Sequence, residues 1–577
     1  MGSTIPSLTL HRMIGSDLPP LSSYPPSGTV SRQSLTAFSS QQAAGTGLPV
    51  AAGLLALEQP WAAEPLIYPC DPTPLKEPVL VAVSDEAAAC LGESAQTIQG
   101  CPAWAAWLSG SCALEQPSCY ATVYAGHQFG VFVPRLGDGR ALNLGALNGW
   151  ELQLKGAGPT PFARHADGRA VLRSSVREFL CSEAMHGLGI ATTRALSLAV
   201  SQTPVVRERL EPAAVVCRMA PSFLRFGHFE YFAHRAKSHA RFDPHAKALA
   251  QQQTAAMLRS LAEADPGFST LQGLSGFNQI SDFLTIITRK TACLMADWMS
   301  VGFMHGVMNT DNFSALGLTI DYGPFSFMEA FDPNFICNHS DHEGRYRYAA
   351  QPSIGFWNIQ RLLSALAGLY DVDLKSQSAQ SLLEEAQSGY ETAFYNRFEG
   401  RMRDKLGLAH CERAELLATI DRCFLFMQKE SVDFTHFFRS LGHCQPFNAA
   451  LSFEARWAAL ARCLPDSEAS RQFMSELEAQ LQEGEKAEHL MKQASSQASQ
   501  AYATQWSNQR LAANPSFVLR NWVLEEVIRA LEDEGDLGPL HKAMAMLKNP
   551  FNDSLENQGW LEAAPDWAKG LALSCSS

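Results

Sequence analysis

Three oxygen-bearing side chains lie close together between Gly306 and Gly323. Asp311 and Asn312 are adjacent, and Asp321 follows in an Asp-Tyr-Gly sequence. Carboxylate and amide oxygens suit a hard divalent cation that also binds phosphate oxygens. A solvated Asn/Asp turn between a helix and a hairpin explains the same residues equally well. The stretch therefore predicts either a metal-assisted nucleotide site or a polar turn.

Protein kinases build a comparable site from a catalytic-loop Asp, an Asn five residues later and the Asp of Asp-Phe-Gly. If Asn312 is that Asn, the catalytic Asp would fall at position 307, which is Val307. A valine side chain cannot accept a proton. The sequence therefore has the candidate metal ligands of a kinase, Asn312 and Asp321, without the usual kinase base.

The segment before this stretch predicts β-structure. Between Gly130 and Gly156 we expect three strands separated by turns at Asp138-Gly139 and Asn148-Gly149, because these dipeptides favour hairpins. The third strand spans 150–155. Further short strands are expected at 195–200 and 214–219, and a long helix from 277 to about 304 leads into the stretch described above.

Lys155 ends the third strand, and Glu178 lies in the helix predicted to follow. In a kinase, such a lysine and glutamate pair to hold phosphates, whereas a surface lysine and a helix-face glutamate are the structural alternative. We expect this helix to be capped by Ser174 or Ser175 and to end at Gly187 or Gly189.

Other residues suit anion binding. Gly137, Gly139 and Arg140 could form a turn whose backbone N–H groups approach a phosphate, although a plain hairpin turn is an equal explanation. Arg218 and Arg225 flank a strand end. They could bind phosphate oxygens through their forked guanidinium groups, or pair with a nearby carboxylate.

One cluster of cysteine and histidine residues and one single cysteine suggest metal or redox chemistry. Cys337, His339 and His342 have a metal-like composition, but their spacing is too short and no second Cys/His pair follows at a zinc-site distance. Cys575 lies near the C-terminus. An accessible thiol there could oxidise onto another exposed cysteine.

Composition excludes several classes of protein. The chain has 577 residues, and its net charge of −13 argues against a general binder of nucleic acid or membrane surfaces. The 14 cysteines form no CxxC pair, which favours a reducing compartment. No uncharged apolar run reaches the roughly 20 residues of a membrane span.

The order of these features predicts an α+β protein with a two-lobed, kinase-like fold and an additional helical C-terminal region. We expect the following units: 1–60, a disordered or targeting extension; 61–123, an N-terminal subdomain; 124–230, the β-rich N-lobe; 231–355, the C-lobe core with the metal loop; and 356–577, a helical region ending in Cys-Ser-Ser.

The chain resembles the selenoprotein O family, the YdiU-like proteins, from about Tyr68 to Ser577. The resemblance rests on YAGHQFG at 124, LGDGRA at 136, LKGAGPTPFARHADGRAVLRSSVREFL at 154, LRFGHFE at 224, HGVMNTDN with IDYGPF, QPSIGFWNIQRL, NPSFVLRNW and the Cys-Ser-Ser end. It implies a kinase fold without the usual catalytic Asp. It also implies an enzyme that binds ATP in a flipped orientation and transfers AMP to protein hydroxyl groups.

Site roles follow from this resemblance one position at a time. Asp311 would be the proton acceptor, Glu178 would orient Lys155, and Asn312 and Asp321 would hold Mg²⁺ or Mn²⁺. The residues implied to contact the nucleotide are Gly137, Gly139, Arg140, Lys155, Asp167, Gly168, Arg218, Arg225 and Asp321. The implied partners are protein substrates and ATP, with UTP as an open alternative, and neither nucleic acid nor a membrane.

Family members from eukaryotes carry selenocysteine near the C-terminus, where this chain has Cys575. The resemblance implies that Cys575 can pair with Cys337 as a redox switch. A bacterial cytoplasm is the expected location, with a mitochondrial matrix as the alternative. A conventional kinase and a non-catalytic, nucleotide-binding scaffold remain competing hypotheses for the function.

Overall fold

The computed structural model describes most of the chain after residue 65. The described residues are 66–111, 119–240, 243–372, 376–409, 411–484, 496–552, 559–568 and 571, together with β1 (Gln41–Gln42) and β2 (Pro49–Val50). Most of the predicted extension 1–60 lies outside these residues, and so does Cys575. The described residues therefore include the candidate site. The hypotheses about the N-terminal extension and about Cys575 stay predictions.

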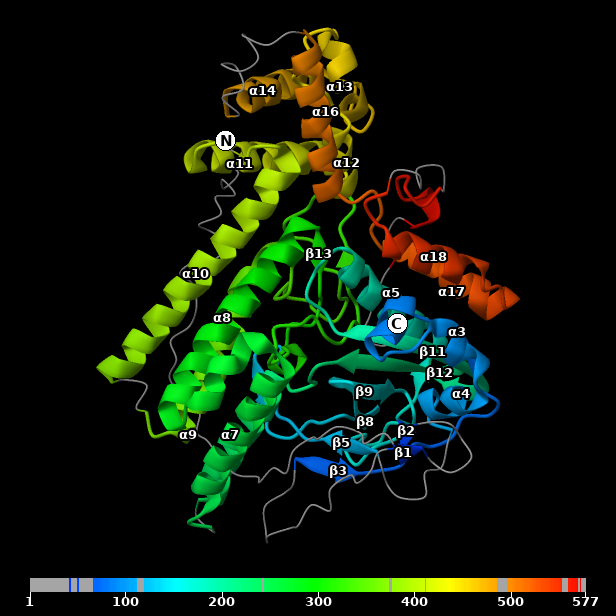
Figure 1. Ribbon diagram of the computed structural model, residues 1–577, viewed down its shortest axis with the longest axis vertical. Coiled ribbons are helices and arrows are strands. Elements are labelled where there is room, and N and C mark those ends of the chain that lie inside the picture. Colours follow the sequence, from blue (N-terminus) through cyan, green and yellow to red (C-terminus); the bar gives the residue numbers. More distant parts are fainter. Residues whose placement is uncertain are drawn as a thin grey trace.

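An eight-stranded antiparallel sheet forms one side of the molecule (Figure 1). Its order is β3-β5-β8-β9-β12-β11-β4, with β10 paired to β12. The strands are β3 (Ile67–Pro69), β4 (Val79–Val83), β5 (Tyr120–Thr122), β8 (Ala141–Leu147), β9 (Trp150–Lys155), β10 (Ala170–Val171), β11 (Arg194–Val206) and β12 (Leu210–Ala220). Three short helices, α2 (Asp85–Cys90), α3 (Ala95–Gly100) and α4 (Pro102–Leu108), pack near it.

The expected turn at Asn148-Gly149 joins β8 to β9, and both residues have positive φ, as a two-residue hairpin turn requires. The prediction of a hairpin at Asp138-Gly139 was wrong. The strand before it, β7 (Val131–Val133), pairs instead with β6 (Gly126–Gln128) through a turn at Phe129-Gly130. Phe-Gly is not a recognised hairpin signal, which is why the sequence pointed to the wrong turn.

Helix α5 (Leu172–Gly187) packs on β11 and β12 and presents one face to the sheet. The chain leaves the helix through Gly189, whose φ of +70° is left-handed, as predicted. The expected serine cap is absent: the N-cap is Val171, with no side-chain cap hydrogen bond. The helix begins at least three residues earlier than predicted because it continues directly from β10.

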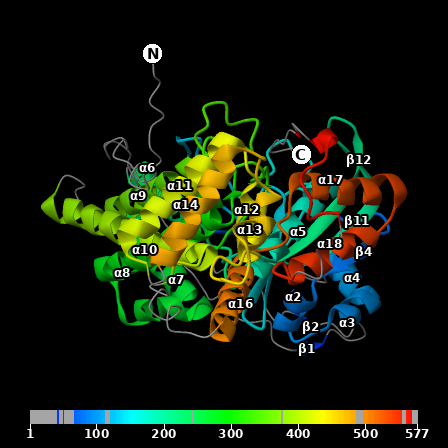
Figure 2. The same cartoon turned by 90° about the horizontal axis from the view of Figure 1, so that it is seen from above.

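Helices make up the other side of the molecule (Figures 1 and 2). The expected long helix is α8 (Gly276–Ser300), and α10 (Gln377–Leu406) runs along it. The others are α6 (Phe226–His239), α7 (Ala246–Ala264), α9 (Gln351–Leu369), α11 (Arg413–Glu430), α12 (Phe434–Gly442), α13 (Phe453–Ala461), α14 (Glu468–Gly484), α16 (Ser496–Ala513), α17 (Asn521–Arg529) and α18 (Gly538–Lys548). Among the described residues, none of these helices is long and apolar enough to cross a membrane.

Short elements fill the space between the two sides. The pair β13 (Phe303–Met304) and β14 (Ser326–Phe327) brackets the stretch with the three oxygen-bearing side chains. Within that stretch, the 3₁₀ turn η2 (Thr310–Asn312) contacts both α6 and β6. The C-terminal helices α17 and α18 return to pack against α5. The mixed α/β composition, with one antiparallel sheet and many helices, agrees with the expected fold class.

Lys405, near the end of α10, is a buried cation that weakens the fold at neutral pH. Its ammonium lies 4.6 Å from the ring centre of Phe438. Burial, and then repulsion from Arg401, lowers the pKa of Lys405 from 10.5 to about 7. The folded protein therefore binds this proton less tightly than the unfolded chain, so the penalty is full below about pH 7 and disappears as the pH rises towards 10.5.

We expect Lys405→Met to raise the free energy of unfolding at pH 7. A tenfold change in proton affinity corresponds to about 1.4 kcal/mol, so the gain reaches several kcal/mol and shrinks as the pH approaches 10.5. Urea unfolding at a series of pH values measures it. Lys429→Met, on an exposed lysine of α11, is the control and should change little. Equal curves for the two variants would show that the Lys405 amine carries no such penalty.

Candidate active site

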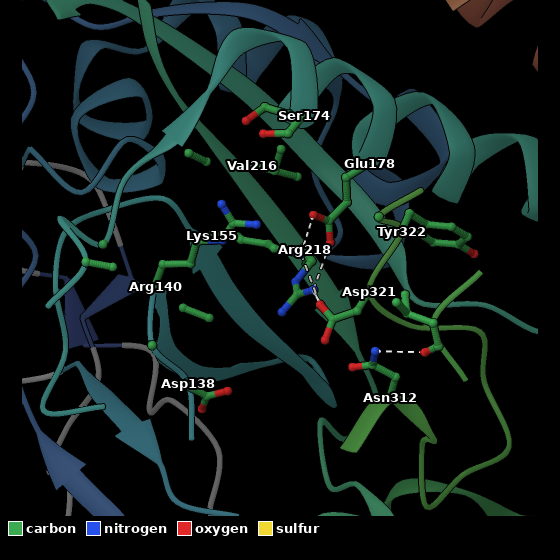
Figure 3. Close-up of a pocket in the computed structure, with 18 of the residues that line it drawn as sticks. Asp138, Arg140, Lys155, Ser174, Glu178, Val216, Arg218, Asn312, Asp321 and Tyr322 are labelled. Carbon is green, nitrogen blue, oxygen red and sulfur yellow. Dashed lines mark hydrogen bonds and ion pairs between the residues drawn. The ribbon is translucent and has the colours of Figure 1, made fainter. Parts of the chain in front are cut away.

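A cavity of about 620 Å³ opens between the sheet and the helical side. Of the residues predicted to form the site, Gly137 is the one that does not line it. Those that do are Gly139, Arg140, Lys155, Asp167, Gly168, Glu178, Arg218, Arg225, Asp311, Asn312 and Asp321. Figure 3 shows Lys155, Glu178, Arg218 and Asp321 pointing toward one another, with Asn312 below them in this view. Residues more than 180 positions apart in the chain thus share one hollow.

Asp321 is the centre of the charge arrangement. Its Oδ1 atom lies 3.1 Å from Nζ of Lys155 and also accepts a hydrogen bond from Arg218, while Oδ2 accepts one from Arg225. Burial would raise the pKa of Asp321, but Arg225, Lys155 and Arg218 outweigh it and hold the pKa well below its usual range. The carboxylate is therefore ionised at every physiological pH.

The three cations reach Asp321 from different elements. Lys155 ends β9, Arg218 lies on β12 beside it, and Arg225 immediately precedes α6. Asp321 meets them with a backbone φ of +60°, which is uncommon for a residue other than glycine. An aspartate in the left-handed backbone conformation is strained. Asp321 can keep this conformation because the surrounding structure, including the three cations, holds its carboxylate in place.

Glu178, on helix α5, forms an ion pair with Lys155 and so links β9 to this helix. Its Oε2 atom lies 2.6 Å from Nζ of Lys155, so the contact expected between these residues is present. Oε1 accepts a hydrogen bond of 2.8 Å from Arg218, which also donates to Gln153 on β9. Glu178 thus fixes the position of two of the three cations. The surface-lysine alternative does not hold for Lys155, which is largely buried.

Asp311 and Asn312 form the opposite wall of the cavity. The amide nitrogen of Asn312 donates to the backbone oxygen of Val307 at 2.9 Å, so the amide oxygen is the atom of this side chain that could bind a cation. Burial raises the pKa of Asp311 to about 7, although its own backbone N–H and Arg225 oppose the rise. The Oδ1 atom of Asp311 is buried and has no hydrogen-bond partner among the described residues. A carboxylate in this state can take up a proton.

Strand β6 is in direct contact with Asp311, and the sequence did not predict this contact. The side-chain amide of Gln128 donates to Oδ2 of Asp311 at 3.3 Å. A Cβ atom placed on Gly126 would lie 2.3 Å from Oδ1 of Asp311, so no larger residue fits without displacing the carboxylate. Gly126 and Gln128 both belong to the YAGHQFG sequence. That motif was the only feature of the sequence that could have indicated their contact with Asp311.

The turn around Gly139 approaches the cavity through its backbone. Gly139 and Arg140 line the cavity, and a Cβ atom on Gly137 would lie 2.4 Å from the ring of Phe162. Gly137 therefore allows close packing beneath the turn and does not face the cavity. Asp138, between these two glycines, is buried. Its Oδ2 atom accepts hydrogen bonds from both the backbone N–H and the hydroxyl of Thr122. Hydrogen bonds to Thr122, the last residue of β5, therefore hold this turn beside the cavity.

Asp167 and Gly168 form part of the cavity rim, and a residue that the sequence did not single out holds them. Arg207, in the turn between β11 and β12, makes two hydrogen bonds to Asp167, of 2.7 and 3.0 Å, and a third to the backbone oxygen of Arg169. These bonds lower the pKa of Asp167. No sequence signal identified Arg207, because the contact spans 40 residues.

The donor set at this site fits a hard divalent cation only in part. Within the described part of the chain, no three His, Cys, Asp or Glu side chains are clustered to hold a metal ion. The oxygen-bearing groups available are the Asn312 amide and the Asp321 carboxylate, which suit Mg²⁺ or Mn²⁺ when phosphate oxygens and water complete the shell. Two side chains alone do not complete the coordination shell, so a metal ion at this site would also need phosphate oxygens of the nucleotide as ligands.

Cys337 packs against Gly306, at the start of the stretch that carries Asp311. It is buried, and a Cβ atom on Gly306 would come within 2.7 Å of its sulfur. His339 and His342 follow it in the same loop, and His342 is exposed. Because Cys575 lies outside the described residues, its pairing with Cys337 stays a prediction.

Comparison with known proteins identifies the family of this chain. The model of the family described as protein adenylyltransferase SelO matches residues 71–548. This chain belongs to the SelO family. It is therefore a member of a family of nucleotidyltransferases, and the resemblance seen in its motifs is confirmed.

Curated relatives of this SelO chain are similar over most of their length. The protein nucleotidyltransferase YdiU of Cupriavidus metallidurans is 41% identical over 522 residues, which cover 88% of each chain. That of Paraburkholderia xenovorans is 42% identical over 515 residues, covering 87% of this chain and 92% of the relative. That of Myxococcus xanthus is 40% identical over 512 residues, covering 88% and 95%.

We expect Gly126→Ala to reduce adenylyl transfer by this SelO chain about 10²-fold, because the methyl group displaces Asp311 and small misplacements of reacting groups cost about that much. The overpacking should cost about 1–3 kcal/mol of stability. Steady-state transfer rates and thermal melting measure the two effects. Gly100→Ala, where a Cβ atom meets nothing within 4 Å, is the control. Unchanged transfer by Gly126→Ala would mean that the position of Asp311 does not matter.

Proposed function

We propose that this chain transfers AMP from ATP to hydroxyl side chains of proteins, with Asp311 as the proton acceptor. The observation that carries the proposal is the state of Asp311. It is a buried carboxylate in a cation-lined cavity, has one oxygen without a partner in the described structure, and has a pKa raised to about 7. Efficient general bases have a pKa near the operating pH.

The arrangement around Asp311 supports a kinase-like fold with a displaced base. The Lys155–Glu178 pair, the Asn312 amide and the left-handed Asp321 have the chain order of a kinase active site. Val307 lies where a kinase places its base, and its side chain contributes only apolar surface to the cavity. A base four residues further along faces a different part of a bound nucleotide. This change accounts for transfer at the α-phosphate in place of the γ-phosphate.

The cations of the cavity suit a triphosphate. Lys155, Arg218 and Arg225 carry three positive charges, against two negative charges on Glu178 and Asp321. The excess positive charge favours a polyanion and stabilises the charge that accumulates on pyrophosphate as it leaves. The rest of the lining adds three arginines and three carboxylates, so that cations outnumber carboxylates by six to five: Arg140, Arg169, Arg207, Asp138, Asp167 and Asp311. The cations hold the outer phosphates of a flipped nucleotide, so the α-phosphate faces Asp311.

The reaction proceeds in one displacement. The acceptor hydroxyl oxygen attacks the α-phosphorus while its proton passes to Asp311. The bond from the α-phosphorus to the oxygen bridging to the β-phosphate breaks, and pyrophosphate leaves with that oxygen. The acceptor is then joined to AMP through a phosphodiester bond. Asn312 and Asp321 would hold Mg²⁺ or Mn²⁺, which when bound neutralises charge on the phosphates.

ATP labelled separately at the α- and γ-phosphates distinguishes the candidate functions. With Mg²⁺ or Mn²⁺ and a protein extract as acceptor, we expect α-label on protein and no γ-label. Asp311→Asn keeps the shape of the side chain but cannot accept the proton, so transfer should fall about 10²–10⁴-fold.

Transfer of the γ-label alone would instead identify a kinase, and binding of ATP without either label would identify a scaffold. UTP labelled at the α-phosphate tests the nucleotide: its label should appear on protein only if UMP is also transferred. Asp311→Asn with full activity would remove Asp311 as the acceptor and leave the identity of the transferred group unaffected.

Arg207→Ala should raise the KM for ATP about tenfold and leave kcat nearly unchanged. Loss of the two hydrogen bonds releases Asp167 at the cavity rim, and charge-assisted bonds of this kind contribute about 1.5–3 kcal/mol. Initial rates at varied ATP concentrations measure the effect. Arg209→Ala is a matched control in the same turn, because Arg209 pairs with Glu532, away from the cavity. Equal KM values in the two variants would contradict a nucleotide contact through Asp167.

A further inference from the structure

Two hairpin turns in this chain have nearly the same backbone but different residues. At the β8–β9 turn, Asn148 and Gly149 have φ values of +51° and +81°. At the β6–β7 turn, Phe129 and Gly130 have φ values of +50° and +85°. Each turn joins its strands through two residues. The first uses the residues that this turn favours, and the second places phenylalanine where asparagine is preferred.

Phe129 is therefore not explained by the folding of its own turn. A bulky residue in the left-handed region is strained, and the side chain is 40% exposed. Strain and exposure together weaken the fold, and Asn148 shows that the same chain can build this turn without them. A role in binding would explain both features.

The turn is fixed to the wall of the cavity that carries Asp311. The backbone N–H of Phe129 donates to Oδ1 of Asn309 at 3.0 Å, and Asn309 lines the cavity. The hydroxyl of Tyr346 donates to the same oxygen at 2.6 Å, and its ring lies 5.2 Å from that of Phe129. The preceding residue, Gln128, bonds to Asp311 itself. Phe129 is thus held one residue from a direct contact with the proposed base.

Other exposed apolar side chains belong to the same region. Val131, next to the turn, is 69% exposed, and Phe335 and Ile336 are also exposed. Ile336 packs close to Gly344, where a Cβ atom would lie 3.0 Å from its Cδ1, and Gly344 precedes the Arg345–Tyr346 pair. We call Phe129, Val131, Phe335, Ile336 and Arg345 the acceptor rim. Exposed apolar clusters of this kind mark interaction surfaces.

Arg345 gives the acceptor rim a positive charge. Its guanidinium lies 4.5 Å from the ring centre of Trp357 and next to Gly130. Two of its nitrogen atoms, Nε and Nη2, are buried and have no hydrogen-bond partner in the described part of the chain. No ion pair of Arg345 with a carboxylate is present there either. The residue as a whole is only half-buried, so its charge is complementary to an acidic group on a partner.

We propose that the acceptor rim binds the polypeptide whose hydroxyl receives AMP, and that it favours an apolar and an acidic residue near that hydroxyl. The inference rests on the proposed function, because only a protein acceptor must place a hydroxyl beside Asp311. The apolar residue packs on Phe129 and Val131, and the acidic residue faces Arg345. Nucleotide binding does not involve the rim.

The substitution Phe129→Asn separates binding from folding, because it restores the preferred turn residue while removing the ring. We expect the melting temperature to be unchanged or higher and the affinity for ATP to be unchanged. The KM for a protein acceptor should rise about tenfold or more, as for an aromatic anchor of an interface. Val131→Thr, which keeps the branched shape favoured in a strand, should raise the same KM by a smaller factor. Leu274→Asn, on an exposed side chain outside the rim, is the matched control.

Synthetic peptides with one central threonine test the preference directly. One peptide has leucine and glutamate beside the threonine, a second has serine and glutamate, and a third has leucine and lysine. Wild-type protein should modify the first fastest, Phe129→Asn should lose the preference for leucine, and Arg345→Gln should lose the preference for glutamate. Equal rates with all three peptides in the wild type would overturn the inference, as would an unchanged acceptor KM in Phe129→Asn. Absence of AMP transfer by the wild type would instead refute the proposed function.

Discussion

The structure of the site depends on the neutralisation of one largely buried carboxylate, that of Asp321, by three cations. A buried charge is costly unless it is paired and hydrogen-bonded, and Asp321 satisfies this with Lys155, Arg218 and Arg225. Since these three residues come from β9, from β12 and from the start of α6, their contacts join the sheet to the helical side. The same charges that would bind a polyanion therefore also hold the two sides of the molecule together.

Such an arrangement must exchange partners when a nucleotide binds. Asp321 accepts from all three cations in this structure, whereas phosphate oxygens would compete for the same donors. Glu178 keeps Lys155 and Arg218 paired during that exchange, because it contacts both. Arg225 is anchored differently, by a hydrogen bond of 3.0 Å to the backbone oxygen of Asp311. The cation nearest the proposed base is thus tied to the loop that carries the base.

The sequence was sufficient to predict what short-range chemistry determines. Strand β9, the Asn148-Gly149 turn and the long helix α8 follow from periodicity and turn residues. The resemblance to the SelO family assigned the residues of the nucleotide site, and nearly all of those assigned residues line the cavity. Position 137 was an exception: it bears a glycine because Phe162 packs against it, and this reason exists only in the folded protein.

Long-range contacts were not predictable from one sequence. Arg207 reaches Asp167 because the β11–β12 hairpin is longer than expected and extends over the rim of the cavity. The β6–β7 hairpin was missed because its turn contains Phe129 in place of a turn-forming residue. Where local preference and structure disagree, the residue is often kept for function. The same disagreement that misled the sequence analysis therefore identifies Phe129 as a candidate for acceptor binding.

Displacement of the base and the presence of the rim are connected. In this chain, position 307 is apolar, and the proposed base, Asp311, lies in a turn that contacts β6. Strand β6 has no room for a side chain at Gly126, so it lies against the carboxylate and brings the Phe129 turn with it. Asp311 lies four residues after the position of the kinase base, and the β6–β7 hairpin is what encloses it there. The outer surface of that hairpin then becomes the surface that an acceptor meets first. On this argument, a change in the phosphate attacked and a new acceptor surface are two consequences of one shift in the position of a carboxylate.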